Sequence, residues 1–141
     1  MENNYNNQKS VKRKDNEQPF AVTKKGMRYH HIGIPTSDQK PDEKYLKEYK
    51  FYVSGFDTSE YGIEWMRFEN DSPISEIIKK VPHVAFEVDD IESAVAGKEL
   101  IGEIGSPSKG VRTAMILENG APVEFLEFDR NEVKKVGHKS E

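Results

Sequence analysis

The hydrophobic and polar positions of this chain alternate in some segments and recur at helical spacing in others. Alternation over residues 29–35, 51–53 and 61–68 predicts three strands in the first half of the chain. Residues 41–43, Pro-Asp-Glu, are typical of a helix start, since proline fits the first turn and carboxylates face the positive end of the helix dipole. Residues 45–49 would supply the apolar side of that short helix.

The second half of the chain repeats this order of elements. Residues 82–88 predict a strand, and a helix follows from residues 89–90, with apolar side chains at the helical positions 91, 94 and 95. Three further strands are predicted over residues 101–104, 111–117 and 123–128. The last two are joined through Asn119-Gly120, a pair typical of tight hairpins.

The two halves also place the same residue types at matching positions. Each carries a histidine on its first predicted strand and a glutamate on its last, His31 and Glu64 in the first half and His83 and Glu124 in the second. The segment Ile63-Glu64-Trp65-Met66 matches Val123-Glu124-Phe125-Leu126 in character at every position. The order strand–helix–strand–strand–strand thus occurs twice, which indicates an internal duplication.

Alternation along the strands groups Glu64 and Glu124 with large apolar neighbours. An ionised glutamate among apolar side chains is costly unless it is paired or bound to a cation. Two such glutamates and two histidines at matching positions of two repeats can bind one metal ion together, and the ion then offsets the cost of the buried carboxylates. We therefore predict that His31, Glu64, His83 and Glu124 hold a single metal between the halves.

Each of these residues alone has a simpler explanation. A single histidine on a strand is more often hydrogen-bonded or exposed than a ligand, and a single glutamate more often faces solvent. The matched placement of all four favours the metal site. His30 is expected to point away from His31, as neighbours on a regular strand do, and to be structural or exposed.

Composition limits the class of protein and the nature of the site. At 141 residues the chain has room for one domain of ordinary size. It has no cysteine, so a metal must be held by nitrogen and oxygen atoms. No segment approaches the ~20 apolar residues of a membrane-spanning helix, and we expect a cytoplasmic protein without membrane contact. The net charge of −4 argues against nucleic acid as a partner.

The ends of the chain differ from its middle. Residues 1–26 are rich in Asn, Gln and Lys and show no regular period, which predicts a disordered tail. Residues 131–141 are polar and are expected to form a flexible tail. The folded domain is therefore expected over residues 27–130, with two modules at about 27–80 and 81–130.

Three segments resemble the glyoxalase / bleomycin resistance protein / dioxygenase group, also called the vicinal oxygen chelate superfamily. They are residues 31–34 (His-Ile-Gly-Ile), 81–90 (Val-Pro-His-Val-Ala-Phe-Glu-Val-Asp-Asp) and 120–126 (Gly-Ala-Pro-Val-Glu-Phe-Leu). The resemblance implies an α+β fold in which two βαβββ modules form an open, barrel-like cleft. The first module departs from the family pattern, because the usual longer helix with its Phe-Tyr and Leu-Gly-Phe motifs is missing.

The resemblance also implies a ligand set and partners. The family's metal ligands sit on the first and last strand of each module, and by position they fall on His31, Glu64, His83 and Glu124. The resemblance further implies a divalent metal (Ni, Co, Zn, Mn or Fe), no organic cofactor and a small-molecule substrate. A homodimer is expected, since the short first module leaves a sheet edge and apolar surface that a second copy can cover.

Three functions are compatible with this site. The first is a metal-dependent lyase or isomerase of the glyoxalase type, which stabilises an enediolate as a proton leaves the carbon next to a carbonyl; Glu124 is the preferred base and Glu64 the alternative. The second is an iron-dependent extradiol-type dioxygenase, against which the second carboxylate argues. The third is a metal-free binding or resistance protein, with Trp65, Phe68 and Phe86 as aromatic walls.

Overall fold

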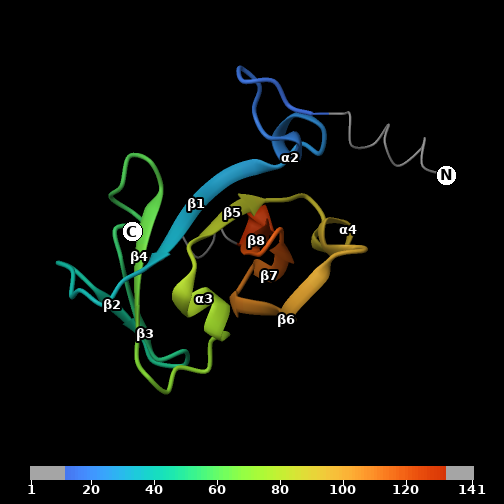
Figure 1. Ribbon diagram of the computed structural model, residues 1–141. Helices are drawn as coiled ribbons and strands as arrows, with labels where there is room; N and C mark the ends of the chain where they lie inside the picture. Colours follow the sequence, from blue (N-terminus) through green and yellow to red (C-terminus); the bar gives the residue numbers. More distant parts are fainter. Residues whose placement is uncertain (1–11, 133–141) are drawn as a thin grey trace.

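One curled sheet of eight strands organises the molecule, in the order β2-β3-β4-β1-β5-β8-β7-β6 (Figure 1). The computed structural model of the protein describes residues 12–132. Its strands are β1 (Arg28–Pro35), β2 (Lys44–Leu46), β3 (Phe51–Ser54), β4 (Ile63–Phe68), β5 (His83–Glu87), β6 (Glu99–Ser108), β7 (Val111–Glu118) and β8 (Ala121–Phe128). Its helices are α2 (Phe20–Thr23), α3 (Glu76–Lys80) and α4 (Ile91–Val95). The predicted α+β class, with two four-stranded halves in one curled sheet, is confirmed.

The two halves of the sheet are joined through β1 and β5, which pair in antiparallel orientation at its centre. On the outer side of β1 lies β4, which runs parallel to it, and on the outer side of β5 lies β8, again parallel. Antiparallel strands complete each half, β3 and β2 on one side and β7 and β6 on the other. The strand arrangement of the first half therefore recurs in the second, as the duplication predicts.

The hairpin that joins β7 to β8 is formed where the sequence predicts it. Asn119 and Gly120 both have positive φ, 51° and 80°, as a two-residue turn that follows the twist of the strands requires. Asparagine and glycine are the residues that adopt this region at low cost. The hairpin sets the register in which β8 carries Glu124.

The helix predicted to start at residues 41–43 is wrong. Lys44–Leu46 forms the edge strand β2, and no helix lies between β1 and β2, a stretch that the structure describes in full. Asp42 has a φ of 58°, in the left-handed region, which a right-handed helix cannot continue through. The rings of Tyr45 and Tyr52 pack across β2 and β3 at 4.6 Å. Cross-strand packing thus outweighs a short amphipathic pattern.

Basic side chains make cation–π contacts and an ion pair on the face of the first module that has no covering helix. Lys40 Nζ lies 4.2 Å from the centre of the Trp65 ring, and the Arg67 guanidinium lies 4.1 Å from that of Tyr52. Arg67 also donates two hydrogen bonds, of 2.8 and 2.6 Å, to the Glu43 carboxylate. The loop before β2 therefore packs on this face through one cation–π contact, from Lys40, and one ion pair, from Glu43, rather than through a helix.

Strand β6 is longer than the predicted segment 101–104. It spans residues 99–108 and so extends beyond the predicted segment at both ends. Its pairing with β7 shifts register on both sides of Gly105, as bulged edge strands do. Most of β6 is exposed at the edge of the sheet.

The main core belongs to the second module and lies between the sheet and α4. Phe86, Ile91 and Phe125 are among its buried side chains, and Ala21 and Val22 of α2 pack against it. The predicted disordered tail of residues 1–26 thus includes an ordered helix, because these two apolar side chains find a core that the five-residue α4 leaves partly open. Residues 1–11 and 133–141 lie outside the described part of the chain.

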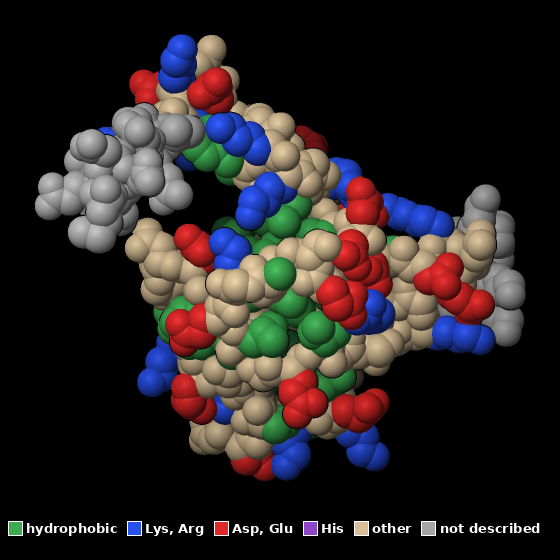
Figure 2. Space-filling model, turned by 90° about the vertical axis from the view of Figure 1, so that its right-hand side faces the viewer, with side chains coloured by type: hydrophobic (Ala, Val, Ile, Leu, Met, Phe, Trp, Pro, Cys, Tyr) green, Lys and Arg blue, Asp and Glu red, His purple; other side chains and the backbone are tan. Residues whose placement is uncertain are grey.

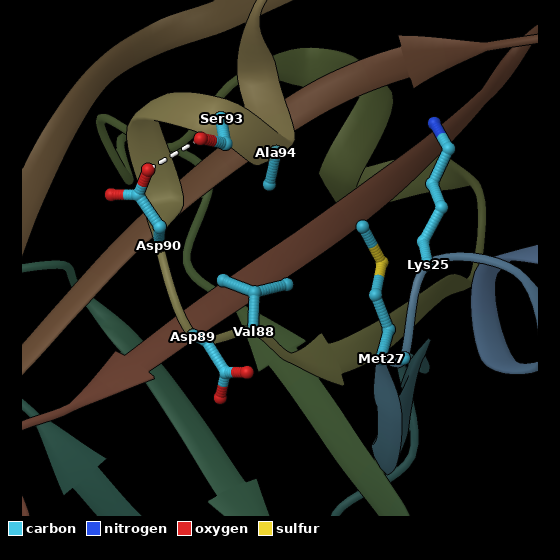
Figure 3. A pocket seen from close by; sticks show the side chains of 8 residues that line it. Lys25, Met27, Val88, Asp89, Asp90, Ser93 and Ala94 are labelled. Atoms are coloured by element: carbon cyan, nitrogen blue, oxygen red, sulfur yellow. Dashed lines mark hydrogen bonds between the residues drawn. The ribbon is translucent and has the colours of Figure 1, made fainter.

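A cavity of about 310 Å³ separates the N-terminal segment from α4. Figure 3 shows Met27 on one side of it, Val88 and Ala94 on the other, and the hydrogen bond between Ser93 and Asp90 at the start of α4. None of the four predicted ligands lines this cavity. None of the helices between residues 12 and 132 is long and apolar enough to cross a bilayer.

We expect Val22→Asp to destabilise the protein by about 1–3 kcal/mol, because it places a carboxylate against the apolar core. The matched control is Thr23→Asp, which adds the same charge one residue further along α2 at an exposed position. Urea denaturation followed by circular dichroism measures both variants. Equal midpoints for the two variants would show that α2 does not contribute to the core.

Candidate metal centre

Four strands each contribute one predicted ligand to the same region of the sheet: His31 on β1, Glu64 on β4, His83 on β5 and Glu124 on β8. Gly33 is paired with both His83 and Glu64. Ala85 is paired in the same way with both His31 and Glu124. The two histidines and the two glutamates are therefore related by the pseudo-twofold symmetry that relates the modules.

Three of the four functional groups meet closely. Glu124 Oε1 lies 3.3 Å from Nε2 of His31 and 3.2 Å from Nε2 of His83. One ligand atom from each of these three residues lies within 4.8 Å of the others. Glu64 Oε1 lies 3.5 Å from Nε2 of His31, outside that group of three. The centre thus consists of two imidazoles and one carboxylate in close contact, with a second carboxylate beside them.

The cluster is partly closed to solvent. His31 and His83 are buried, with exposed fractions of 5% and 2%, whereas each glutamate side chain is 17% exposed. Burial raises the pKa of Glu64 above its ordinary value, although the nearby His31 opposes this. Burial also acts to raise the pKa of Glu124, but hydrogen bonds from both histidines outweigh it and lower the pKa to about 2. The two symmetry-related glutamates therefore differ electrostatically.

The orientation of His83 depends on a glycine in the opposite strand. A Cβ added at Gly33 would stand 2.3 Å from Cε1 and 2.9 Å from Nδ1 of the His83 ring, too close for any real side chain. Nδ1 of His83 is buried and has no hydrogen-bond partner within residues 12–132. Its ring is thus held by packing over Gly33 and by the contact of Nε2 with Glu124.

His30 belongs to the site, contrary to the expectation that it points away from His31. The pairing of β1 with β5 shifts register between Tyr29 and His31, and this bulge at His30 breaks the strict alternation of side chains. Nδ1 of His30 consequently lies 2.8 Å from Nδ1 of His31. Burial lowers the pKa of His30 and the nearby His31 adds to the effect, and both favour the neutral form of this ring.

The aromatic surroundings of the site also differ from expectation. Trp65 and Phe86 lie on the opposite face of the sheet, Trp65 under Lys40 and Phe86 in the core of the second module. The rings near the cluster are those of Phe56, 5.6 Å from His31, and Phe128, 5.5 Å from His30. The bulge that brings His30 and these rings together is invisible in the hydrophobic pattern.

The donor set fits a divalent transition ion. Imidazole nitrogens and carboxylate oxygens suit zinc, nickel, cobalt, manganese and iron(II), whereas a site for calcium or magnesium would be built from oxygen atoms alone. Three convergent donors that are already in mutual contact need little rearrangement to bind one ion. His31, His83 and Glu124 would hold it, and Glu64 lies close enough to join them.

Comparison with solved structures identifies the fold, whereas sequence comparison finds no match. No protein-family model matches the chain, and no curated protein matches it in sequence. The crystal structure of methylmalonyl-CoA epimerase from Mycobacterium tuberculosis aligns with a TM-score of 0.51 and 17% sequence identity, over 76% of this chain and 91% of that one. The chain has the vicinal oxygen chelate fold. The resemblance drawn from short sequence segments is thus confirmed at the level of the fold.

Two further solved structures match more loosely. A hypothetical protein from Bacillus halodurans C-125 aligns with a TM-score of 0.45 and 21% identity, over 77% of this chain and 81% of that one. A glyoxalase family protein from Bacillus cereus aligns with a TM-score of 0.34 and 16% identity, over 82% of this chain and 99% of that one.

We expect Gly33→Ala to weaken zinc binding by about 10–100-fold, the range found when a group that orients a metal ligand is lost. The added methyl group must displace the His83 ring, because the backbone of β1 is paired on both sides. The matched control is Gly105→Ala on β6, where an added Cβ meets nothing within 4 Å. Zinc titration calorimetry of both variants makes the measurement, and unchanged affinity in Gly33→Ala would contradict the assigned role of His83.

Proposed function

We propose that this protein is a metal-dependent lyase or isomerase of the glyoxalase type, which moves a proton next to a carbonyl of a small-molecule substrate. The observation that carries the proposal is the convergence of His31, His83 and Glu124, with Glu64 at their margin. A divalent ion held there supplies Lewis-acid stabilisation for the negative charge that develops on the substrate oxygen. The described structure supports one such buried His–Glu centre, and it lies on the strands that the duplication singled out.

The contacts of the two glutamates suit them to different roles, one as a metal ligand and one as a base. Glu124 touches both histidines and has a lowered pKa, so it is suited to be a fixed, ionised ligand. Glu64 has one ion-pair contact, at 3.5 Å, and burial raises its pKa, so it is the carboxylate with fewer partners and the more basic one. We therefore assign Glu64 as the base that takes the carbon-bound proton, in place of the Glu124 preferred from the sequence.

The structural neighbour is consistent with this chemistry. The aligned protein from Mycobacterium tuberculosis is named as an epimerase, and an epimerase inverts a carbon centre, which proton removal and return can accomplish. A substrate of this kind, an α-hydroxycarbonyl, a hemithioacetal or an acyl thioester, has a proton made acidic by its adjacent carbonyl. The proposal for this chain rests on its own four side chains.

A second candidate has one observation in its favour. Two histidines and one glutamate in close contact, with the other glutamate outside the group, are the donor set that iron(II) oxygenases of the extradiol type use. Glu64 beside the group still argues against this function, because it would occupy a position that oxygen and substrate need. Oxygen consumption with a catechol in the iron-loaded protein distinguishes the two.

Solvent exchange tests the chemistry directly. In deuterium oxide, the metal-loaded protein should exchange the carbon-bound proton of a competent substrate, observed by proton NMR across a panel of hydroxyketones, hemithioacetals and thioesters. Glu64→Gln should lower the exchange rate by about 10²–10⁴-fold without loss of the metal, because it removes the base. Glu118→Gln, an exposed position on β7, serves as the control and should exchange at the wild-type rate.

The companion variant Glu124→Gln should behave differently from Glu64→Gln. It removes the carboxylate that both histidines contact, so its main effect is weaker metal binding, and added metal should restore much of the exchange. If Glu64→Gln loses the metal while Glu124→Gln loses only the rate, the assignment of the two glutamates is reversed. A protein that takes up no divalent ion is a metal-free binding protein, and the proposed function is then wrong.

We also propose that the protein forms a homodimer. The edge strand β6 exposes 43% of Leu100, and hydrophobic side chains are visible among charged ones on the face that carries α4 and β6 (Figure 2). An exposed sheet edge with apolar side chains is a ready surface for a second copy. We expect sedimentation velocity at micromolar concentration to show a dimer, and Leu100→Glu to shift it towards monomer. A monomer in the wild type contradicts this proposal.

A further inference from the structure

We propose that His30 is a positioning residue that holds His31 in the tautomer able to bind a metal through Nε2. The inference rests on the proposed metal site. The observation that carries it is the 2.8 Å separation of the two Nδ1 atoms, a hydrogen bond created by the bulge in β1. His30 itself is not among the three clustered donors, and its Nδ1 lies against Nδ1 of His31.

A hydrogen bond between two Nδ1 atoms requires one to donate and the other to accept. When Nε2 of His31 binds a metal, that atom offers its lone pair, so the proton of the neutral ring sits on Nδ1. His31 Nδ1–H then donates to Nδ1 of His30, which carries its own proton on Nε2. The arrangement matches the general pattern in which a ligating histidine donates a hydrogen bond from its other ring N–H to a fixed acceptor.

The same contact also serves the metal-free protein. Nε2 of His31 lies 3.3 Å from Glu124 and 3.5 Å from Glu64, where an Nε2–H donates to a carboxylate. Nδ1 of His31 then accepts a hydrogen bond from Nδ1–H of His30. Both rings stay neutral when the metal binds. Nε2 of His31 loses its proton, the proton between the two Nδ1 atoms moves from His30 to His31, and Nε2 of His30 gains a proton. Histidine is suited to this position because its Nδ1 can either donate or accept.

The His30 ring packs against two aromatic rings. The Phe56 ring lies 5.3 Å from it and the Phe128 ring 5.5 Å, so the acceptor is fixed relative to β1 by packing as well as by the bulge. His83, the symmetry-related ligand, has no such partner, since its buried Nδ1 is unpaired within the described chain. The two histidine ligands are therefore oriented by different means, His31 by a hydrogen bond and His83 by packing over Gly33.

Two substitutions separate the hydrogen bond from the packing. His30→Phe keeps a ring beside Phe56 and Phe128 but removes the acceptor, so zinc affinity should fall by about 10–100-fold. His30→Asn places an amide oxygen close to the position of Nδ1, so it should stay within a few-fold of wild type. Zinc binding is measured by competition with a chromophoric chelator, and the thermal midpoints of the metal-free variants report on folding.

A nitrogen NMR experiment provides a readout that packing alone does not move. In the zinc-loaded wild type, long-range nitrogen–proton spectra should show His31 protonated at Nδ1 and His30 at Nε2. If wild type binds zinc and His30→Phe binds it equally well, the inference is wrong while the proposed function stands. Equal weakening in both variants also overturns it, because the role is then one of packing. Failure of the wild type to bind zinc or any other divalent transition ion overturns the proposed function itself.

Discussion

The antiparallel pairing of β1 with β5 is the interaction on which the rest of the structure depends. It joins the two modules, and its register sets Gly33 opposite His83 and Ala85 opposite His31. A slip of one residue would turn the side chains of one strand to the other face of the sheet and separate His31 from His83. The small residues at positions 33 and 85 follow from the same constraint, since a ring needs room above the neighbouring strand.

The site concentrates charge in a place where isolated charge is costly. A buried carboxylate without partners loses several kcal/mol of hydration, roughly, even after the protein relaxes. Contacts from the imidazoles of His31 and His83 offset this loss for Glu124, which is why its pKa falls although it is buried. The same orientation aims both Nε2 atoms at one point. The geometry that pairs the Glu124 carboxylate with both imidazoles is thus also the geometry that binds a metal. Glu64 has fewer partners, and we propose it as the base.

The two modules differ in what covers the sheet but keep the same pairing of their inner strands. The second keeps a short helix, α4, over its core, assisted by α2 from outside the repeat. The first has no helix between β1 and β2 and covers its sheet with a loop, in which Lys40 lies over Trp65 and Glu43 pairs with Arg67. The two central strands, β1 and β5, pair with each other and otherwise only with β4 and β8, and this pattern is the same in both halves.

The sequence by itself determined the duplication, most of the strands, the Asn119-Gly120 turn and the four His and Glu positions. These are local signals, because alternation and turn preference depend on neighbours in the chain. Tertiary structure decided the rest. Lys44–Leu46 became a strand because Tyr45 could pack on Tyr52, and residues 20–23 became a helix because a core was exposed to receive them. The role of His30 depends on a bulge, and a bulge arises only when two strands must match each other's register.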